Sequence, residues 1–356
     1  MKLLGTHHVR FARTNSVRAL VPVALAASMA AAVALAPTVA TRLEPIAHAQ
    51  SRPAGIETLH FHHVHLNSVD PKAAAAYYPK PFSTATATTF NGLDAVKTGN
   101  VYILFTKVAK PPLTELSGPQ TSVWHFGWNT PNSREYNERF RKMGLKIAQM
   151  WDALDGKLVD MSSDVLPGLP TQEQILEMRA KGVQPERKGG FGYLRGPDDV
   201  MIENAQSGTV ERFNHVHMYH EHPRCAMLWY QAHLGAVIPQ GRGGAAPPTE
   251  ATCKELYAPP TWPSFAKHGF VRDPAGGVLF DDISISMRPW PGGGLVSTRG
   301  KIYDHWALST SDLDLTVARL KKENVKFLEE IQPWGTTRAA MIEGPDRIAI
   351  ELVEVK

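Results

Sequence analysis

The chain has 356 residues, of which 43% are hydrophobic and 20% charged, and its formal net charge is +4. This length allows two domains with substantial cores, and the composition excludes wholesale disorder. The positive charge belongs to the N-terminus, because residues 1–49 hold five basic side chains and one acidic one, which leaves 33 of each in the rest of the chain. Because residues 50–356 have no net charge, the composition gives no argument for a nucleic-acid partner.

Residues 1–49 have the layout of a secretory signal peptide. The first 20 residues include four basic side chains and no acidic one. A run of 14 mostly apolar residues follows at 23–36, and a small-x-small sequence ends at Ala49. That order is typical of exported proteins. The alternative is an uncleaved anchor, but the run is short for a bilayer span of about 20 residues. We therefore expect cleavage near Ala49, a tether over 50–58, and a periplasmic or secreted protein without stable membrane association; the oligomeric state is not indicated.

The chain has two cysteines, Cys225 and Cys253. In an oxidising compartment they can form a disulfide, but two buried thiols are equally compatible with the sequence. Their spacing does not fit a zinc knuckle.

The rest of the chain reads as four units of similar order. Each opens with a short alternating strand, continues into a helix and ends in further strands. Apolar residues at helical spacing predict helices over 135–143 and 313–323, and closing strands are expected at 200–203 and 348–351. Long insertions at 152–190, with one helical stretch, and at 240–263 are expected to cap a site or form an interface. The four units cover approximately residues 59–108, 122–206, 212–288 and 301–355.

An internal repeat places histidines and glutamates in the same order in both halves. His63-Val64-His65-Leu66 matches His215-Val216-His217-Met218 without a gap, and each later Gly-Pro-Asp sequence precedes a glutamate at the same offset. The order His, His, Glu therefore occurs twice, and two imidazoles with a carboxylate are what a catalytic metal site needs. The repeated residues are His63, His125 and Glu203 in the first half, and His215, His305 and Glu351 in the second.

Strand geometry makes the first histidine pair specific. Residues i and i+2 share one face of a strand, so His63 and His65 point the same way, as do His215 and His217. The alternative is a solvated surface pair, which the repetition at a fixed register disfavours. Each glutamate follows apolar strand residues, so it is either an edge residue or a buried charge that a cation between imidazoles compensates.

These motifs resemble the vicinal oxygen chelate superfamily, which includes glyoxalase I, extradiol dioxygenases and bleomycin resistance proteins. The first strands at 61–66 and 303–308 fit its apolar-x-His pattern, and the glutamates after the Gly-Pro-Asp turns fit its last strands. The resemblance implies an α+β fold of four βαβββ units paired into two cupped mixed-sheet barrels, with domains at 59–208 and 209–356. It also implies one metal site from His63, His125 and Glu203, and another from His215, His305 and Glu351.

The fourth ligand position of glyoxalase-like sites is not matched. Residues 101–105 offer no ligand, and the count in the third unit reaches Phe280, with Asp281 or Asp282 available only after a register shift. Three protein ligands with open positions are typical of non-haem iron oxygenases. We expect an exported enzyme that binds a divalent metal ion, Fe(II) in preference to Zn, Mn or Ni, and acts on a small substrate through two neighbouring oxygens.

Extradiol-dioxygenase-like chemistry is the favoured reaction class. The alternatives are a glyoxalase-like lyase or isomerase, and a binding protein that sequesters a small molecule without turnover. His65 and His217 are the candidates for proton transfer, and Tyr219 is a candidate for substrate contact.

Overall fold

The computed structural model describes residues 56–114, 117–148, 191–239, 247–254, 276–290 and 294–355, with short pieces at 151–152, 158–159, 161–162, 177 and 180–182. The predicted signal peptide lies outside the described residues, as do most of both insertions and the first part of the predicted tether. A search of the described helices for an apolar segment of bilayer length found none.

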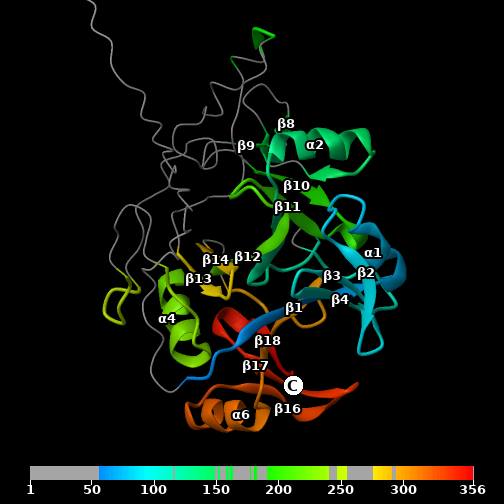
Figure 1. The fold of residues 1–356 in the computed structure, drawn as a ribbon. Helices are drawn as coiled ribbons and strands as arrows, with labels where there is room; N and C mark the ends of the chain where they lie inside the picture. Colours follow the sequence, from blue (N-terminus) through cyan, green and yellow to red (C-terminus); the bar gives the residue numbers. More distant parts are fainter. Residues whose placement is uncertain are drawn as a thin grey trace, which may run out of the picture. The chain divides into compact units, whose positions relative to one another are not determined.

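The first sheet has eight strands in the order β16-β17-β18-β15-β1-β4-β3-β2. Its strands come from the first and the fourth predicted units (Figure 1). They are β1 (His60–Ser68), β2 (Thr86–Phe90), β3 (Leu93–Thr98), β4 (Val101–Lys107), β15 (Tyr303–Thr310), β16 (Phe327–Trp334), β17 (Thr337–Glu343) and β18 (Ala349–Glu354).

The second sheet is built in the same way from the second and third units. Its order is β13-β14-β12-β5-β11-β10-β6, and β9 pairs with β10 beside this path. The strands are β5 (Val123–Asn129), β6 (Ile147–Ala148), β9 (Met161–Ser162), β10 (Phe191–Arg195), β11 (Met201–Ala205), β12 (Arg212–His220), β13 (Gly277–Phe280) and β14 (Ile283–Pro289); β7 (Trp151–Asp152) and β8 (Leu158–Val159) form a separate pair.

The mixed α+β architecture with two cupped sheets is confirmed, but the units do not pair in chain order. Each sheet combines one unit from 59–208 with one from 209–356, so the predicted domain boundary does not separate the sheets. Within each sheet the two units meet at a seam between their first strands, which run antiparallel: β1 against β15, and β12 against β5. Inside each unit the first strand pairs in parallel with the last one, which is β4, β11, β14 or β18. All four first strands carry a histidine within an apolar run, and this shared feature cannot select which of them pair.

Among the described residues, four α-helices complete the units. They are α1 (Pro71–Tyr77), α2 (Ser133–Lys142), α4 (Pro223–Leu234) and α6 (Leu313–Lys322). The two helices predicted from apolar spacing are α2 and α6, and the side chains of Asn132 and Asp312 accept hydrogen bonds from their first free backbone N–H groups. α2 packs on β10 and β11, and α6 packs on β16, β17 and β18 (Figure 1).

One continuous apolar core joins the two sheets. It includes the aromatic pair Phe61 and Phe213, one from β1 and one from β12, with ring centroids 6.0 Å apart. Tyr230 on α4 lies 5.9 Å from Trp306 on β15, which links the helix of the third unit to the first sheet. The side chains on the other face of each first strand are then free to build a site.

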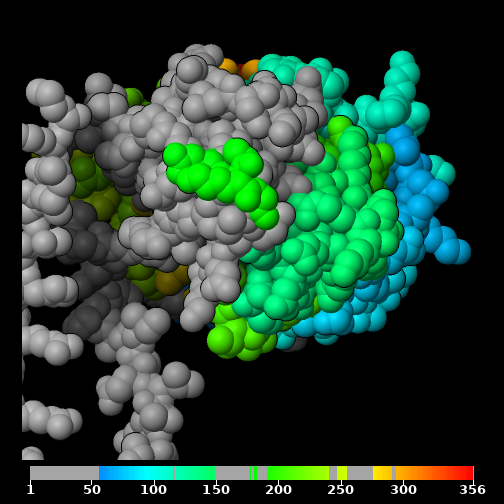
Figure 2. Space-filling model, turned by 90° about the horizontal axis from the view of Figure 1, so that it is seen from above, coloured from blue at the N-terminus to red at the C-terminus, as the bar shows by residue number. Residues whose placement is uncertain are grey.

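The Gly-Pro-Asp turns connect the sheets as well as leading into the last strands. They form the short helices η1 (Pro197–Asp199) and η2 (Pro345–Arg347), in which Asp198 and Asp346 have positive φ. The Asp198 carboxylate accepts a hydrogen bond from the backbone N–H of Val69, and that of Asp346 bonds to His220 Nδ1 at 2.6 Å. The first and second units, blue and teal, border each other on the surface shown in Figure 2.

The end of the predicted tether is fixed to the fourth unit. The carboxylate of Glu57 accepts hydrogen bonds from the hydroxyls of Thr310, Ser311 and Thr316, at 2.8, 2.9 and 2.8 Å. These bonds hold the pKa of Glu57 below its ordinary value against the opposing effect of burial.

Candidate metal centres

The first sheet brings three histidines and one glutamate together on one face. His63 and His65 on β1 lie beside His305 on β15, with one ligand atom of each within 4.8 Å of the others. Glu351 on β18 completes the group, because its Oε2 lies 3.3 Å from His63 Nε2 and 3.7 Å from His305 Nε2. We call these four residues the Glu351 centre.

The second sheet carries the equivalent group. His125 on β5, Glu203 on β11 and the pair His215 and His217 on β12 lie with one ligand atom of each within 4.8 Å of the others. Glu203 Oε2 is 2.5 Å from His125 Nε2, 3.4 Å from His215 Nε2 and 3.6 Å from His217 Nδ1. We call these four residues the Glu203 centre.

All six predicted metal ligands therefore lie in two clusters, but the predicted grouping is wrong. His63 lies with Glu351 rather than with Glu203, and His215 lies with Glu203 rather than with Glu351. The reason is the pairing of the units. Glu203 shares a unit with His125 and meets the histidines of the third unit, whereas Glu351 shares a unit with His305 and meets the histidines of the first.

His65 and His217, predicted as proton-transfer residues, belong to the clusters themselves. In the parallel register of β15 and β18, Glu351 lies opposite Ala307, two residues after His305. In the first unit, the residue two positions after His63 is His65, and it lies opposite Leu104 in the parallel strand β4. Leucine therefore occupies the position of the missing carboxylate, and the imidazole of His65 on the adjacent strand faces the site instead.

The Glu203 centre repeats this substitution. His217 lies opposite Ser286 in β14, so the missing carboxylate position of the third unit is Ser286 rather than Phe280. The aspartates considered as substitutes lie elsewhere: Asp281 pairs with His60, and Asp282 with Arg212.

The clusters have unsatisfied polar atoms that fit a metal ion. Within the described part of the chain, no hydrogen bond reaches the following buried atoms of the Glu351 centre: His63 Nε2, His65 Nδ1, His305 Nε2 and Glu351 Oε2. The same is true of His215 Nε2 and His217 Nδ1 in the Glu203 centre. Buried polar atoms normally have partners. Three imidazole nitrogens and a carboxylate oxygen are suitable ligands for Fe, Zn, Ni or Mn, so the residues fit a divalent cation.

The pKa shifts of three histidines and both glutamates agree with this donor set, whereas the carboxylates of Asp304 and Glu351 raise the pKa of His305 against the effect of burial. Burial lowers the pKa of His63, His65 and His217, which favours neutral imidazoles. Burial acts to raise the pKa of Glu351 and Glu203, but the nearby histidines hold both values below the ordinary one. Neutral imidazole and ionised carboxylate are the forms that bind metal.

Aromatic side chains surround the Glu203 centre. Tyr219 stacks on Trp124 with ring centroids 5.1 Å apart, and Trp124 lies 6.0 Å from His217. Tyr193 lies 5.0 Å from His125, and Trp290 lies 5.1 Å from Tyr219. The predicted substrate contact Tyr219 is thus part of an aromatic wall at this centre.

A large cavity in the described part of the chain lies outside both clusters. Its volume is about 1180 Å³, and it is lined by the first residues of β1 and β12 together with charged side chains such as Asp281 and Arg338. His62 is the connection to the Glu351 centre, because it lines the cavity and its Nδ1 lies 2.8 Å from His63 Nδ1.

The model of the Glyoxalase/Bleomycin resistance protein/Dioxygenase superfamily matches residues 212–352, the segment that supplies β12 and β15 to the two seams. This segment belongs to that superfamily. A search of curated proteins found no significant match.

The superfamily fold extends beyond the matched segment. Glyoxalase I from Zea mays has 14% identity and a TM-score of 0.51, over 84% of this chain and 93% of that one. A mutant of the same enzyme gives 13% identity and a TM-score of 0.51, over 84% and 94%. A putative dioxygenase from Bacillus subtilis gives 12% identity and a TM-score of 0.46, over 84% and 86%. At these identities, the Zea mays structures show the shared fold alone.

Proposed function

We propose that the chain is an exported metal-dependent enzyme of the vicinal oxygen chelate type, which acts on a small substrate with two neighbouring oxygens. The observation that carries this proposal is the pair of buried clusters, each with three histidines and one glutamate. Holding such ligands without a cation is unfavourable, and a structural scaffold has no need of two copies.

A divalent ion bound at either centre would supply Lewis-acid polarisation of the substrate oxygens. The chain's own residues supply orientation and shielding from water. His65 is held by a hydrogen bond of 2.7 Å between its Nε2 and the hydroxyl of Thr106, which leaves Nδ1 facing the cluster. Aromatic side chains, Trp124 and Tyr219 among them, surround the Glu203 centre, and we propose a catechol-like substrate for this centre.

The number of side chains that bind the ion separates two reaction classes. Two histidines and a glutamate leave three positions of an octahedral ion open, which suits a dioxygenase that takes a two-oxygen substrate and O₂ together. If His65 and His217 also coordinate, two positions remain, enough for the substrate oxygens of a glyoxalase-like lyase or isomerase. Ring cleavage with Fe(II) is our first candidate, and the placement of the third histidine of each centre, His65 or His217, is the observation that favours the second.

Two features support export. The N-terminal 49 residues read as a signal peptide, and Cys225 and Cys253 form a disulfide with 28 residues of separation. Disulfides persist mainly in oxidising compartments. Expression with the native N-terminus, followed by the mass of the protein recovered outside the cytoplasm, tests this directly: a chain that still begins at Met1 contradicts cleavage.

The enzyme proposal is tested by reconstituting the metal-free protein anaerobically with Fe(II), Zn(II), Mn(II) or Ni(II). Each form is then assayed with catechols for O₂ uptake and with α-hydroxycarbonyl compounds for isomerisation. Ring cleavage by the Fe(II) form supports the first candidate, and turnover without O₂ supports the second. Binding of catechols without turnover in any form indicates a sequestration protein and contradicts both.

A further inference from the structure

In each first strand, a β-bulge precedes the first histidine that contributes to a centre, so it stands before His63, His305, His215 and His125. Along the β1–β15 seam, Phe61 pairs with Leu308 and His63 with Ala307, so His62 is the extra residue; Asp304 is the extra residue on the opposite strand. The β12–β5 seam has the same two bulges, at Asn214 and Trp124. Bulges redirect side chains beside functional sites, and here they allow a residue to contact its neighbour in sequence.

Three of these four bulge residues bond to the outer nitrogen of the following histidine. His62 Nδ1 lies 2.8 Å from His63 Nδ1, the Asn214 side-chain oxygen lies 2.7 Å from His215 Nδ1, and that of Asp304 lies 2.7 Å from His305 Nδ1. In each case the opposite ring nitrogen faces the cluster. The oxygens of Asp304 and Asn214 can only accept a hydrogen bond, so these two residues select the tautomer that binds a metal ion through Nε2, whereas His62 can serve as donor or acceptor.

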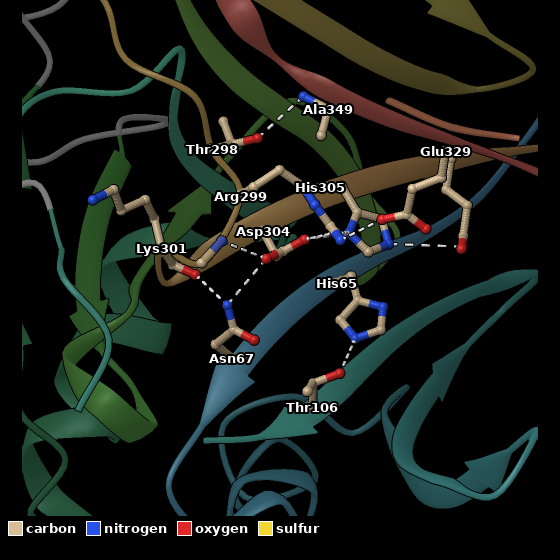
Figure 3. A network of polar contacts seen from close by, with 12 residues as sticks. His65, Asn67, Thr106, Thr298, Arg299, Lys301, Asp304, His305, Glu329 and Ala349 are labelled. Carbon is tan, nitrogen blue, oxygen red and sulfur yellow. Dashed lines mark hydrogen bonds and ion pairs between the residues drawn. The ribbon is translucent and has the colours of Figure 1, made fainter. Parts of the chain in front are cut away.

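Asp304 differs from the other bulge residues because it is anionic. Figure 3 shows its carboxylate in contact with both His305 and the guanidinium of Arg299, and the amide of Asn67 donates to it at 3.2 Å. The backbone N–H of Gly300 also donates to it at 2.6 Å. Asp304 is buried and fully engaged, so its orientation toward His305 is fixed before any ion binds.

An ion-pair network holds Arg299 against Asp304, and the other bulge positions have no such carboxylate. Arg299 also binds Glu329, with Nη2 and Oε1 2.7 Å apart, which holds the guanidinium against Asp304 (Figure 3). At the matching position before His125 stands Trp124, whose indole has no acceptor atom. Before His215 stands Asn214, whose amide oxygen is a neutral acceptor.

A carboxylate behind a ligating imidazole increases the basicity of the ligand and fixes its orientation. Loss of such a partner typically costs about 10- to 100-fold in metal affinity. The negative charge also attracts the cation through space, an effect that the adjacent Arg299 guanidinium offsets in part. A neutral amide in the same place fixes the orientation but contributes neither of the electrostatic effects.

We propose that the two centres bind metal with different affinities, and that Asp304 makes the Glu351 centre the tighter one. The Glu203 centre is then the exchangeable one. This inference rests on the proposed metal binding. It assigns Asp304 a positioning role, and Arg299 and Asn67 the role of holding Asp304.

The test is titration of the metal-free, full-length mature protein with Co(II) in competition with a chromophoric chelator. We expect two affinity classes separated by about 10- to 100-fold. Glu351→Ala should remove the tight class and Glu203→Ala the weak one, with the Co(II) absorption of the remaining centre unchanged. A single class in the unaltered protein, or removal of the weak class by Glu351→Ala, overturns the inference.

Two reciprocal substitutions isolate the carboxylate. Asp304→Asn keeps the shape and should weaken the tight class about 10- to 100-fold, whereas Asn214→Asp adds a carboxylate behind His215 and should tighten the weak class. A gain of affinity is not expected from any general loss of structure, so Asn214→Asp remains informative if Asp304→Asn fails to fold. No change in the weak class with Asn214→Asp overturns the role given to the carboxylate. Protein that binds no Co(II) instead contradicts the metal-enzyme proposal itself.

Discussion

His65 and His305 lie directly opposite each other across the seam between β1 and β15, with ring centroids 4.4 Å apart. His217 and His125 have the same relationship across the seam between β12 and β5, at 4.6 Å. Each centre is therefore built across a junction of two units, and each needs a histidine from both sides of the junction. The testable consequences concern His65 at the Glu351 centre, Gly127 beside the Glu203 centre, and the contacts that stabilise the fold.

The first prediction concerns His65. If its Nδ1 is a ligand, His65→Ala should reduce the metal affinity of the Glu351 centre by at least about tenfold and leave the Glu203 centre unchanged. Adding Leu104→Glu to this variant places a carboxylate at the vacant position and should restore part of the affinity. Metal titration of both variants provides the measurement. Unchanged affinity with lost turnover would instead support the original expectation that His65 transfers protons.

Gly127 is predicted to be essential for the Glu203 centre. A Cβ atom there would lie 2.6 Å from His215 Cε1 and 2.7 Å from the backbone oxygen of Glu203. Gly127→Ala should therefore displace His215, lower the free energy of unfolding by about 1–3 kcal/mol and remove one metal ion. Ala307→Gly at the equivalent position is the control; it should cost about 0.5–1 kcal/mol and keep both ions. A Gly127→Ala protein with both ions would contradict this role of the glycine.

Glu211 should make stability depend on pH in the acidic range. It accepts hydrogen bonds from Thr84, Ser83 and Tyr136, which hold its pKa below the ordinary value although burial acts in the opposite direction. A lowered folded-state pKa means that the stabilisation is complete above the pKa of an unfolded glutamate, about 4.3, and is lost as the pH falls through the folded-state value.

Urea unfolding of the parent and of Glu211→Gln at a series of pH values measures this effect. The variant should be less stable by about 1–2 kcal/mol at pH 7, and the difference should shrink as the pH falls below 4. A difference that stays constant with pH would show that the carboxylate charge has no part in it.

The disulfide between Cys225 and Cys253 ties residues 247–254 to α4. For a separation of 28 residues, loop-closure entropy gives about 3–4 kcal/mol of stabilisation. The double variant Cys225→Ser with Cys253→Ser should lose approximately this free energy of unfolding, and added reductant should destabilise the parent but not the variant. Equal sensitivity to reductant in both proteins would contradict the bond.

Much of the site could be predicted from the sequence. The i, i+2 histidines, the histidines of β5 and β15, and the glutamates after the Gly-Pro-Asp turns are local patterns, and all six predicted ligands lie in the two clusters. The repeated spacing of these residues indicated the units, and apolar residues at helical spacing indicated the helices α2 and α6. These features depend on contacts that are close in sequence.

The partners of these residues could not be predicted. The first strands of all four units have similar patterns, so nothing local states that β1 pairs with β15 rather than β5. The bulges that turn Asp304 and Asn214 toward the histidines arise only when the seams form. For Asp304 a weak signal existed, since a carboxylate directly before a ligand histidine in an apolar strand requires a partner. Nothing in the sequence placed Cys225 near Cys253.

The most direct test of the account is the number of metal ions bound by the double variant His63→Ala with Glu351→Ala. Both residues belong to one centre, so the parent should bind two ions per chain, Glu351→Ala one, and the double variant still one. If the triads followed chain order, His63 and Glu351 would belong to different centres and the double variant would bind none. Loss of both ions from a folded double variant would therefore contradict the pairing of units on which the two centres are built.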